Sequence, residues 1–219
     1  MAAKNKSRRG AASSGITRDP ERTRAQILRA AGAEFARHGL GGARVERIAA
    51  AAGANKRMLY YYFRDKEGLF LAALEARYAH IRDAERSLKL ARLSPVSAVK
   101  RLVTFTWNYF LEHPEFMTLL NSENLHRGRH LAQSARVPQM HTPLVETLRA
   151  ILKRGEQAGL FRRGIDPVQL YISIAGEGYF YLSNRYTLSR IFGRDLMTKA
   201  ALARRARHNT AMIVNALRR

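Results

Sequence analysis

The apolar residues of this chain recur at helical spacing over most of its length. Near the start, Ile27, Ala31 and Phe35 lie four residues apart, which predicts one amphipathic helix. We expect this helix to begin after Asp19 and to end at Gly39. Aspartate is a favourable N-cap, and glycine tolerates the left-handed conformation that ends many helices.

Two shorter helices are predicted next, over residues 45–52 and 56–63, with a turn at Gly53 between them. Asn55 can cap the second of these helices, because its side chain can accept a hydrogen bond from a backbone N–H of the first turn. Three short helices, of which the last two are joined by a tight turn, are typical of the helix-turn-helix motif. The second helix of that pair enters the major groove of DNA.

The rest of the chain also shows helical spacing, and it has no alternating strand pattern and no repeat of fixed period. Residues 126–140 are polar and are predicted as a loop. The sequence therefore predicts an all-α protein with a disordered basic arm over residues 1–16, a helix-turn-helix domain over 17–66 and a helical domain over 67–219. Apolar stripes, caps and prolines place the later helices at residues 66–90, 95–112, 114–125, 143–158, 167–186 and 196–217.

Charge points to a polyanionic partner. Among the 219 residues, Lys and Arg number 39 and Asp and Glu number 17, so the net charge is +22. Residues 1–66 hold 15 of the bases and 5 of the acids, which makes the first third nearly twice as basic per residue as the rest. Such a field attracts nucleic acid first and an anionic membrane surface second. Whether the basic arm itself contacts DNA stays open.

Composition excludes several classes of protein and site. The chain has no cysteine, which rules out disulfides, thiolate metal sites and cysteine nucleophiles and suits a reducing cytoplasm. Its longest uncharged apolar run, residues 102–111, is about half the length that crosses a bilayer. The basic N-terminus lacks the apolar segment of a signal peptide. We expect a cytoplasmic protein with no membrane partner, no metal and no cofactor.

Residues 22–70 resemble the DNA-binding domain of the TetR (tetracycline-repressor) family of transcriptional regulators. The stretch reads RTRAQILRAAGAEFARHGLGGARVERIAAAAGANKRMLYYYFRDKEGLF. About 50 residues match in order and spacing, which makes the signal specific. The matching positions are Ile27, Leu28, Ala30, Ala31, Phe35, Gly39, Val45, Ile48, Ala49, Gly53, Leu59, Tyr60, Phe63, Lys66, Glu67 and Leu69.

The resemblance implies a homodimer that places two helix-turn-helix domains in successive major grooves of an inverted-repeat operator. It implies that the last two long helices form the dimer surface and that the C-terminal domain binds a small-molecule effector. Effector binding moves the two reading heads apart, and most members of the family are repressors. The sequence does not identify the effector, the operator or the regulated genes.

The resemblance also assigns DNA contacts. Tyr60 matches a position whose hydroxyl usually holds a phosphate, and Lys66 matches another phosphate contact. From the residues themselves, Arg57 near the start of the predicted recognition helix is suited to grip guanine O6 and N7. The expected DNA-binding residues are Arg44, Arg47, Asn55, Lys56, Arg57, Met58, Tyr60, Tyr62 and Lys66.

Three of these positions carry open alternatives. Arg44 stands where the family commonly has a Thr or Ser cap, so the cap of that helix is in doubt and Arg44 is expected to reach phosphate instead. Lys56 is expected to contact either a base or a phosphate. In the run of three tyrosines, we expect Tyr61 to pack, whereas Tyr62 stays undecided between packing and DNA.

The effector pocket is expected on helices that line it in relatives of the family. A mostly apolar cavity with a few polar anchors is what a ligand site needs. The alternative for each residue is an ordinary place in the core. The candidates are Trp107, Phe110, Met117, Asn121, Asn124 and Tyr179.

Two rival functions follow from the same residues. The charge alone supports a non-specific polyanion binder, which would show no preference for a palindrome. An enzyme is not expected: Ser97 and Lys100 match S-x-x-K without the motifs that accompany it in such enzymes. His126 and His130 have metal-ligand spacing, but Gly128 lies between them and no acidic partner is evident.

Overall fold

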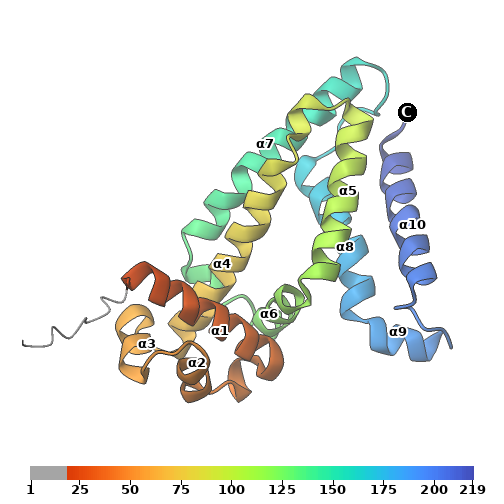
Figure 1. The fold of residues 1–219 in the computed structure, drawn as a ribbon. Helices are drawn as coiled ribbons and strands as arrows, with labels where there is room; N and C mark the ends of the chain where they lie inside the picture. Colours follow the sequence, from red (N-terminus) through yellow and green to blue (C-terminus); the bar gives the residue numbers. More distant parts are fainter. Residues whose placement is uncertain (1–18) are drawn as a thin grey trace, which may run out of the picture.

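The computed structural model describes residues 19–219, and the predicted arm over residues 1–16 lies outside them. Within residues 19–219 the chain forms ten α-helices and two short 3-10 helices (Figure 1). The extended pairing of this part of the chain is limited to an isolated bridge between Phe161 and Arg218. The all-α prediction is confirmed.

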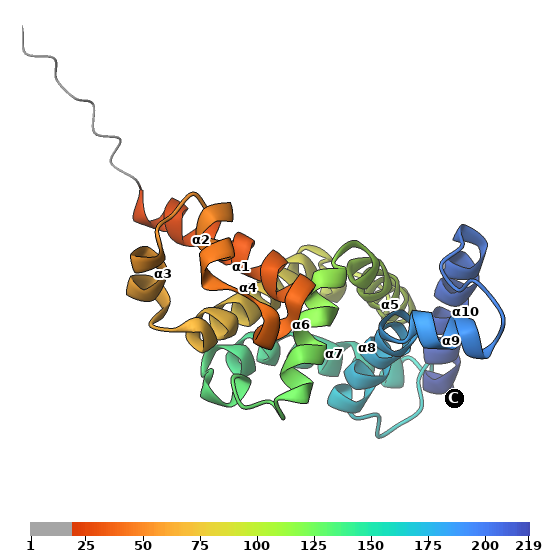
Figure 2. The same ribbon diagram turned by 90° about the horizontal axis from the view of Figure 1, so that it is seen from below.

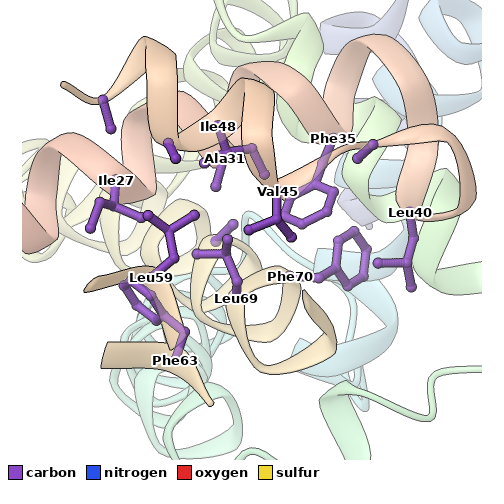
Figure 3. Packing of buried hydrophobic residues seen from close by; sticks show 14 of the residues in the cluster. Ile27, Ala31, Phe35, Leu40, Val45, Ile48, Leu59, Phe63, Leu69 and Phe70 are labelled. Atoms are coloured by element: carbon purple, nitrogen blue, oxygen red, sulfur yellow. The ribbon is translucent and has the colours of Figure 1, made fainter. Parts of the chain in front are cut away.

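The first helices form a unit that we call the head. It consists of α1 (Pro20–Gly42), α2 (Val45–Ala51), α3 (Lys56–Phe63) and the first half of α4 (Lys66–Ser87). Phe35 and Phe70 meet edge to face in its core, with ring centroids 5.1 Å apart. Figure 3 shows the apolar residues that converge there: Ile27, Ala31, Phe35, Leu40, Val45, Ile48, Leu59, Phe63, Leu69 and Phe70.

Backbone geometry interrupts α1 at the predicted place. Gly39 has φ 63° and ψ 177°, and one more turn of helix follows it to Gly42. A positive φ costs glycine little, because it has no Cβ to clash with the backbone. The prediction that the regular helix ends at Gly39 is therefore correct, and the break directs the chain into α2.

The remaining helices form a second unit that we call the body. Its apolar core has two parts, one where α5, α7, α8 and α10 meet and one rich in aromatic rings between α5, α6 and α8. Figures 1 and 2 place α3 and α10 at opposite ends of the molecule. The body contains the second half of α4, η1 (Leu90–Arg92), α5 (Pro95–Glu112), α6 (Pro114–Leu125), η2 (Leu131–Gln133), α7 (Arg136–Gln157), α8 (Pro167–Ser183), α9 (Arg185–Ile191) and α10 (Lys199–Leu217).

The prediction of a loop over residues 126–140 is wrong at its end. The helix predicted from residue 143 begins seven residues earlier, at Arg136, and contains Pro143 in its interior. Pro138 is tolerated because it falls in the first turn, where the backbone N–H has no helical partner. A buried stripe of Val137, Leu144 and Leu148 continues across Pro143 and holds the helix on the core.

The helix predicted over residues 167–186 ends early. It ends at Ser183, and a short helix, Arg185–Ile191, follows. Asn184 between them has φ −101° and ψ 13°, and its side-chain amide donates to the Phe180 carbonyl. The last helix begins at Lys199, because the Thr198 side chain caps it by accepting from the Ala201 N–H.

Two helices connect head and body. α4 has 22 residues, so it extends about 33 Å from the core of the head into the body. α6 contributes Leu119 to the apolar cluster of the head. None of the helices in residues 19–219 is long and apolar enough to cross a membrane.

Candidate nucleic-acid interface

Helix α3 is fixed by its apolar face and presents its polar face outward. Leu59 and Phe63 are 2% and 5% exposed and pack in the core of the head, whereas Lys56 and Arg57 lie on the outside. Asn55 is the N-cap, and its Oδ1 accepts from the Met58 N–H at 2.9 Å. The predicted cap is confirmed, and it sets the start of the helix that carries the candidate contacts.

The first two residues of α3 differ in how their charges are engaged. Arg57 is exposed and forms no hydrogen bond or ion pair within residues 19–219, so its guanidinium is available to an external acceptor. The Lys56 Nζ lies 2.5 Å from Glu46 Oε1, and this contact raises the pKa of Lys56. Both partners are solvent-exposed, and such pairs contribute little to stability, so a DNA phosphate can replace Glu46.

The tyrosine run distributes its three rings differently. Tyr60 is 42% exposed, beside Lys56 on the outer face. Tyr62 is half-buried and packs against the core of the head, as does Met58. Tyr61 is 83% exposed, so the prediction that it packs is wrong for this chain. One residue along a helix turns the side chain by about 100°, which moves Tyr61 away from the face that Leu59 and Phe63 bury.

The N-terminus of helix α2 is fixed by a side chain of α1. The Arg44 side chain makes no capping hydrogen bond, as its departure from Thr or Ser suggested. Instead, Glu34 of α1 accepts from the Arg44 backbone N–H at 3.0 Å and from Arg47 Nε at 2.7 Å. The Arg47 contact holds the pKa of Glu34 below its usual value.

Glu34 is therefore a positioning residue that the sequence reasoning missed. It ties α1 to α2 and engages the charge of Arg47, which also donates to the Gly42 carbonyl at 3.0 Å. The Arg44 guanidinium stays exposed at the surface. In the sequence, Glu34 is a lone acid in an arginine-rich stretch and lies ten residues before a helix start that has no capping side chain. This pattern could have identified it.

Lys66 stands at the first position of α4. Its Nζ donates to the Gly41 carbonyl at 3.2 Å, and the side chain is half-buried. An ammonium has three donors, so this contact leaves two for a phosphate. Asp65 caps the helix by accepting from the Gly68 N–H at 2.7 Å. The contact to Gly41 keeps the cation close to the end of α1.

Two family profiles match the chain. That of bacterial regulatory proteins of the tetR family matches residues 27–73, and that of the tetracyclin repressor-like C-terminal domain matches residues 95–213. The chain belongs to the TetR family. The transcriptional repressor NicS of Pseudomonas putida is 44% identical over 183 residues, which are 84% of this chain and 86% of NicS. The transcriptional regulator RutR of Escherichia coli is 26% identical over 198 residues, 88% of this chain and 89% of RutR.

Solved structures show the same TetR fold. The fatty acid degradation regulator FadR from Bacillus halodurans aligns with a TM-score of 0.68 at 19% identity, over 88% of this chain and 94% of that one. FadR from Bacillus subtilis in complex with stearoyl-CoA aligns with a TM-score of 0.65 at 16% identity, over 88% and 98%. These matches name transcriptional regulators and not enzymes.

In this TetR chain, most of the expected pocket residues lie together. Trp107, Phe110 and Met117 are buried in the aromatic part of the body core. Asn121 Oδ1 accepts from the Tyr179 hydroxyl, and its Nδ2 donates to Ser183 at 3.0 Å. Five of the six candidates thus share one region, and the exception, Asn124, is exposed.

The histidine pair has an acidic partner after all. His130 is buried, and its Nδ1 lies 2.5 Å from Glu123 Oε2. The other oxygen of Glu123 accepts from the His130 and Leu131 backbone N–H groups at 2.9 Å each. The His130 ring also meets Phe70 edge to face at 5.0 Å. This cluster fastens the η2 turn to α6 and to the head.

An arginine–glutamate pair is also buried in the body and was missed. Arg82 and Glu85 of α4 are 3% and 4% exposed. Burial raises the pKa of Glu85 to about 7, and the charge of Arg82 opposes this rise. The spacing in the sequence indicated this burial. Arg82 and Glu85 follow Tyr78 and Ile81 by four residues, which places them on the face of α4 that packs inward.

Proposed function

We propose that this TetR-family protein is a ligand-responsive transcriptional repressor that binds an inverted-repeat operator as a homodimer and is released by a small molecule. One observation gives the strongest support to recognition of a specific DNA sequence by this protein. α3 buries Leu59 and Phe63 and leaves Arg57 exposed and unpaired within residues 19–219, with Lys56 and Tyr60 on the outer side. An arginine that no protein acceptor holds can hydrogen-bond a guanine edge in the major groove.

The remaining contacts follow from their positions. We assign Lys56, Tyr60, Arg44 and Lys66 to phosphates, because each places a donor at the outer surface of the head or at the start of a helix there. Asn55, Met58 and Tyr62 support α3 as cap and packing residues and border the same surface. Arg47 is paired with Glu34, so we expect it to add to the positive electrostatic potential of the head more than to contact DNA directly.

An apolar stripe on α8 supports the dimer. Val168, Ile172 and Phe180 are 43%, 55% and 58% exposed, and they share one face of α8 with Gly176. On α10, Met212 is 50% exposed. Exposed apolar surface of this extent marks an interaction site. We propose that two copies pair through α8 and α10 about a two-fold axis, which places each head on the outside of the dimer.

The small molecule is proposed from the body. The structure of FadR with stearoyl-CoA shows that a TetR-family fold holds a ligand. In this chain the region of Trp107, Phe110, Met117, Asn121 and Tyr179 combines apolar rings with two polar groups, as a pocket requires. We propose a cytoplasmic regulator that needs no metal and no cofactor.

Selection of genomic fragments by the purified protein at about 150 mM salt, followed by sequencing, tests the function. We expect enrichment of an inverted repeat, with a preference of about 1,000-fold or more over unrelated DNA. Enrichment without a shared motif would instead support a non-specific polyanion binder driven by the +22 charge.

Sedimentation of Phe180→Glu tests the dimer surface. A two-fold interface contains each residue twice, so one substitution buries two carboxylates, and we expect the dimer to dissociate at least 100-fold more readily. Leu125→Glu is the matched control, because Leu125 is 84% exposed at the end of α6. Equal effects of the two substitutions would place the interface elsewhere.

A further inference from the structure

A cavity of about 400 Å³ opens between the C-terminal half of α4, η1 and α7. It is separate from the aromatic region that the sequence suggested as the pocket, since its walls come from other residues. Its apolar wall is formed by Leu90, Met140 and Leu144, and its inner end by the buried Arg82 and Glu85.

Arg82 is held on one side only. Its Nη2 donates to the Tyr171 hydroxyl at 2.5 Å, and its guanidinium carbon lies 5.1 Å from the centre of the Tyr171 ring. The same Nη2 lies 3.0 Å from Glu85 Oε1, which is an ion pair without hydrogen-bond geometry. Tyr171 belongs to α8, so the arginine is oriented by a second helix.

The pair has unused hydrogen-bonding capacity. Arg82 Nε and Nη1 have no hydrogen-bond partner among the described residues, and neither has either oxygen of Glu85. Buried polar groups are normally paired, because an unpaired one has lost its water without replacement. An ion pair that served packing alone would be satisfied by its neighbours, whereas this one keeps donors and acceptors beside a cavity.

The charge around the cavity selects for an anion. Arg86, Lys89 and Arg92 are exposed and line the mouth, in addition to Arg82 at the inner end. Glu85 is the one acid among the lining residues, and Asp83 nearby is paired with Arg86. Because cations line the mouth and Arg82 keeps unused donors beside its paired Glu85 at the inner end, an anionic ligand is favoured.

We infer that this cavity binds a small organic carboxylate, whose carboxylate accepts from Arg82 and whose apolar part lies against Leu90, Met140 and Leu144. The inference rests on the proposed function, in which a small molecule binds the body. Charge-assisted hydrogen bonds to an arginine are strong, and a cavity of this size accommodates a ligand of one or two rings. Inorganic phosphate shares the negative charge but has no part that fits the apolar wall.

Titration of the full-length protein without DNA tests the inference. The probes are benzoate and 2-naphthoate, with benzamide and 2-naphthamide as neutral partners of the same shape, and inorganic phosphate as a plain anion. We expect calorimetric binding and a raised Tm with the carboxylates, at least tenfold tighter than with the amides or phosphate. Failure of both carboxylates to bind, or equal binding of the amides, would overturn the inference. Equal binding of phosphate would show an anion site without the apolar part.

Variants locate the site. The double variant Arg82→Met/Glu85→Gln removes the pair as a unit, so it leaves no buried charge unpaired and should keep the fold, which circular dichroism checks. We expect it to weaken 2-naphthoate binding at least tenfold. The matched control is Arg149→Met/Glu146→Gln, which makes the same two substitutions in an exposed Arg–Glu pair of α7 outside the cavity lining, and it should bind the probe as the parent does. Equal weakening by the two double variants would overturn the assignment.

The two hypotheses can fail separately. If 2-naphthoate binds through Arg82 but leaves operator binding unchanged, the site stands and release by this ligand class fails. If an inverted repeat is selected and the protein is a dimer, but no carboxylate binds, the proposed DNA-binding function stands and the ligand assignment fails.

Discussion

The head and the body are both built from α-helices, but they place their polar residues in opposite ways. In the head the buried side chains are apolar apart from Thr23, and its cations lie at the surface. The body buries Arg82, Glu85 and Glu123 together with apolar and aromatic residues. A surface that reads DNA needs exposed donors on a rigid support, whereas a small ligand needs polar groups withdrawn from water. The difference fits the proposed division of the protein into a head that reads DNA and a body that senses a ligand.

The largest expected effect tests the apolar character of the head. Phe35 is fully buried against Phe70, so Phe35→Ala leaves a cavity and should lower the free energy of unfolding by about 3–5 kcal/mol. Urea unfolding measures this loss. Leu125→Ala, at an exposed site, is the control and should change stability by less than about 0.5 kcal/mol.

The second prediction tests the charged interior of the body. Burial raises the pKa of Glu85 from 4.5 to about 7, so between these pH values the folded state holds a proton that the unfolded chain releases. The contribution of Glu85 to the free energy of unfolding should therefore fall as the pH rises from 5 to 8, by about 1–3 kcal/mol at 1.36 kcal/mol per pKa unit.

Urea unfolding of Glu85→Gln across the same pH range provides the comparison. Burial lowers the pKa of His80 and of His141, and both histidines are present in each protein, so their effect cancels in the difference. We expect the parent to lose stability relative to Glu85→Gln as the pH rises. If the free energies of unfolding of the two proteins change in parallel with pH, Glu85 does not titrate in this range. The buried charge of the body would then not make its stability depend on pH.

The third prediction sharpens the role of the head's outer face. Arg57→Ala should remove about 1–3 kcal/mol of discrimination at one base pair in each half-site, because the side chain is assigned to a guanine edge. Selection from a randomised operator measures base preference. Arg47→Ala is the matched control: this arginine is held by Glu34, so base preference should persist. Unchanged preference in Arg57→Ala would refute the readout role.

The smallest expected effect concerns a phosphate contact. Tyr60→Phe removes only the hydroxyl, so binding should weaken by about 0.5–1.5 kcal/mol to the same extent on every operator variant. Affinity measurements on several sequences at constant salt detect this. Tyr186→Phe should leave binding unchanged, because Tyr186 is an exposed tyrosine on α9 of the body, outside the head. A loss confined to one base position would contradict the phosphate assignment of Tyr60.

Local patterns determined most of the head. The stripe of Ile27, Ala31 and Phe35, the Asn55 cap and the Gly39 break are all properties of neighbouring residues, and each was predicted where the structure has it. The exposed position of Arg57 also follows from its place on α3 relative to Leu59, because helical geometry fixes the angle between them. The exposed face of one short helix can therefore be predicted from sequence.

Contacts between distant residues were decided only by the tertiary structure. The start of α7 at Arg136 depends on a stripe that packs against other helices, so Pro143 does not end or begin it. Arg82 meets Tyr171 across 89 positions of sequence, and Glu34 meets Arg47 across 13. The sequence by itself determined the helices of the head, most of those of the body and the polar face of α3, because these depend on spacing. Which charges meet, and where a cavity remains between α4 and α7, depends on how whole helices pack, and spacing along one helix does not contain that information.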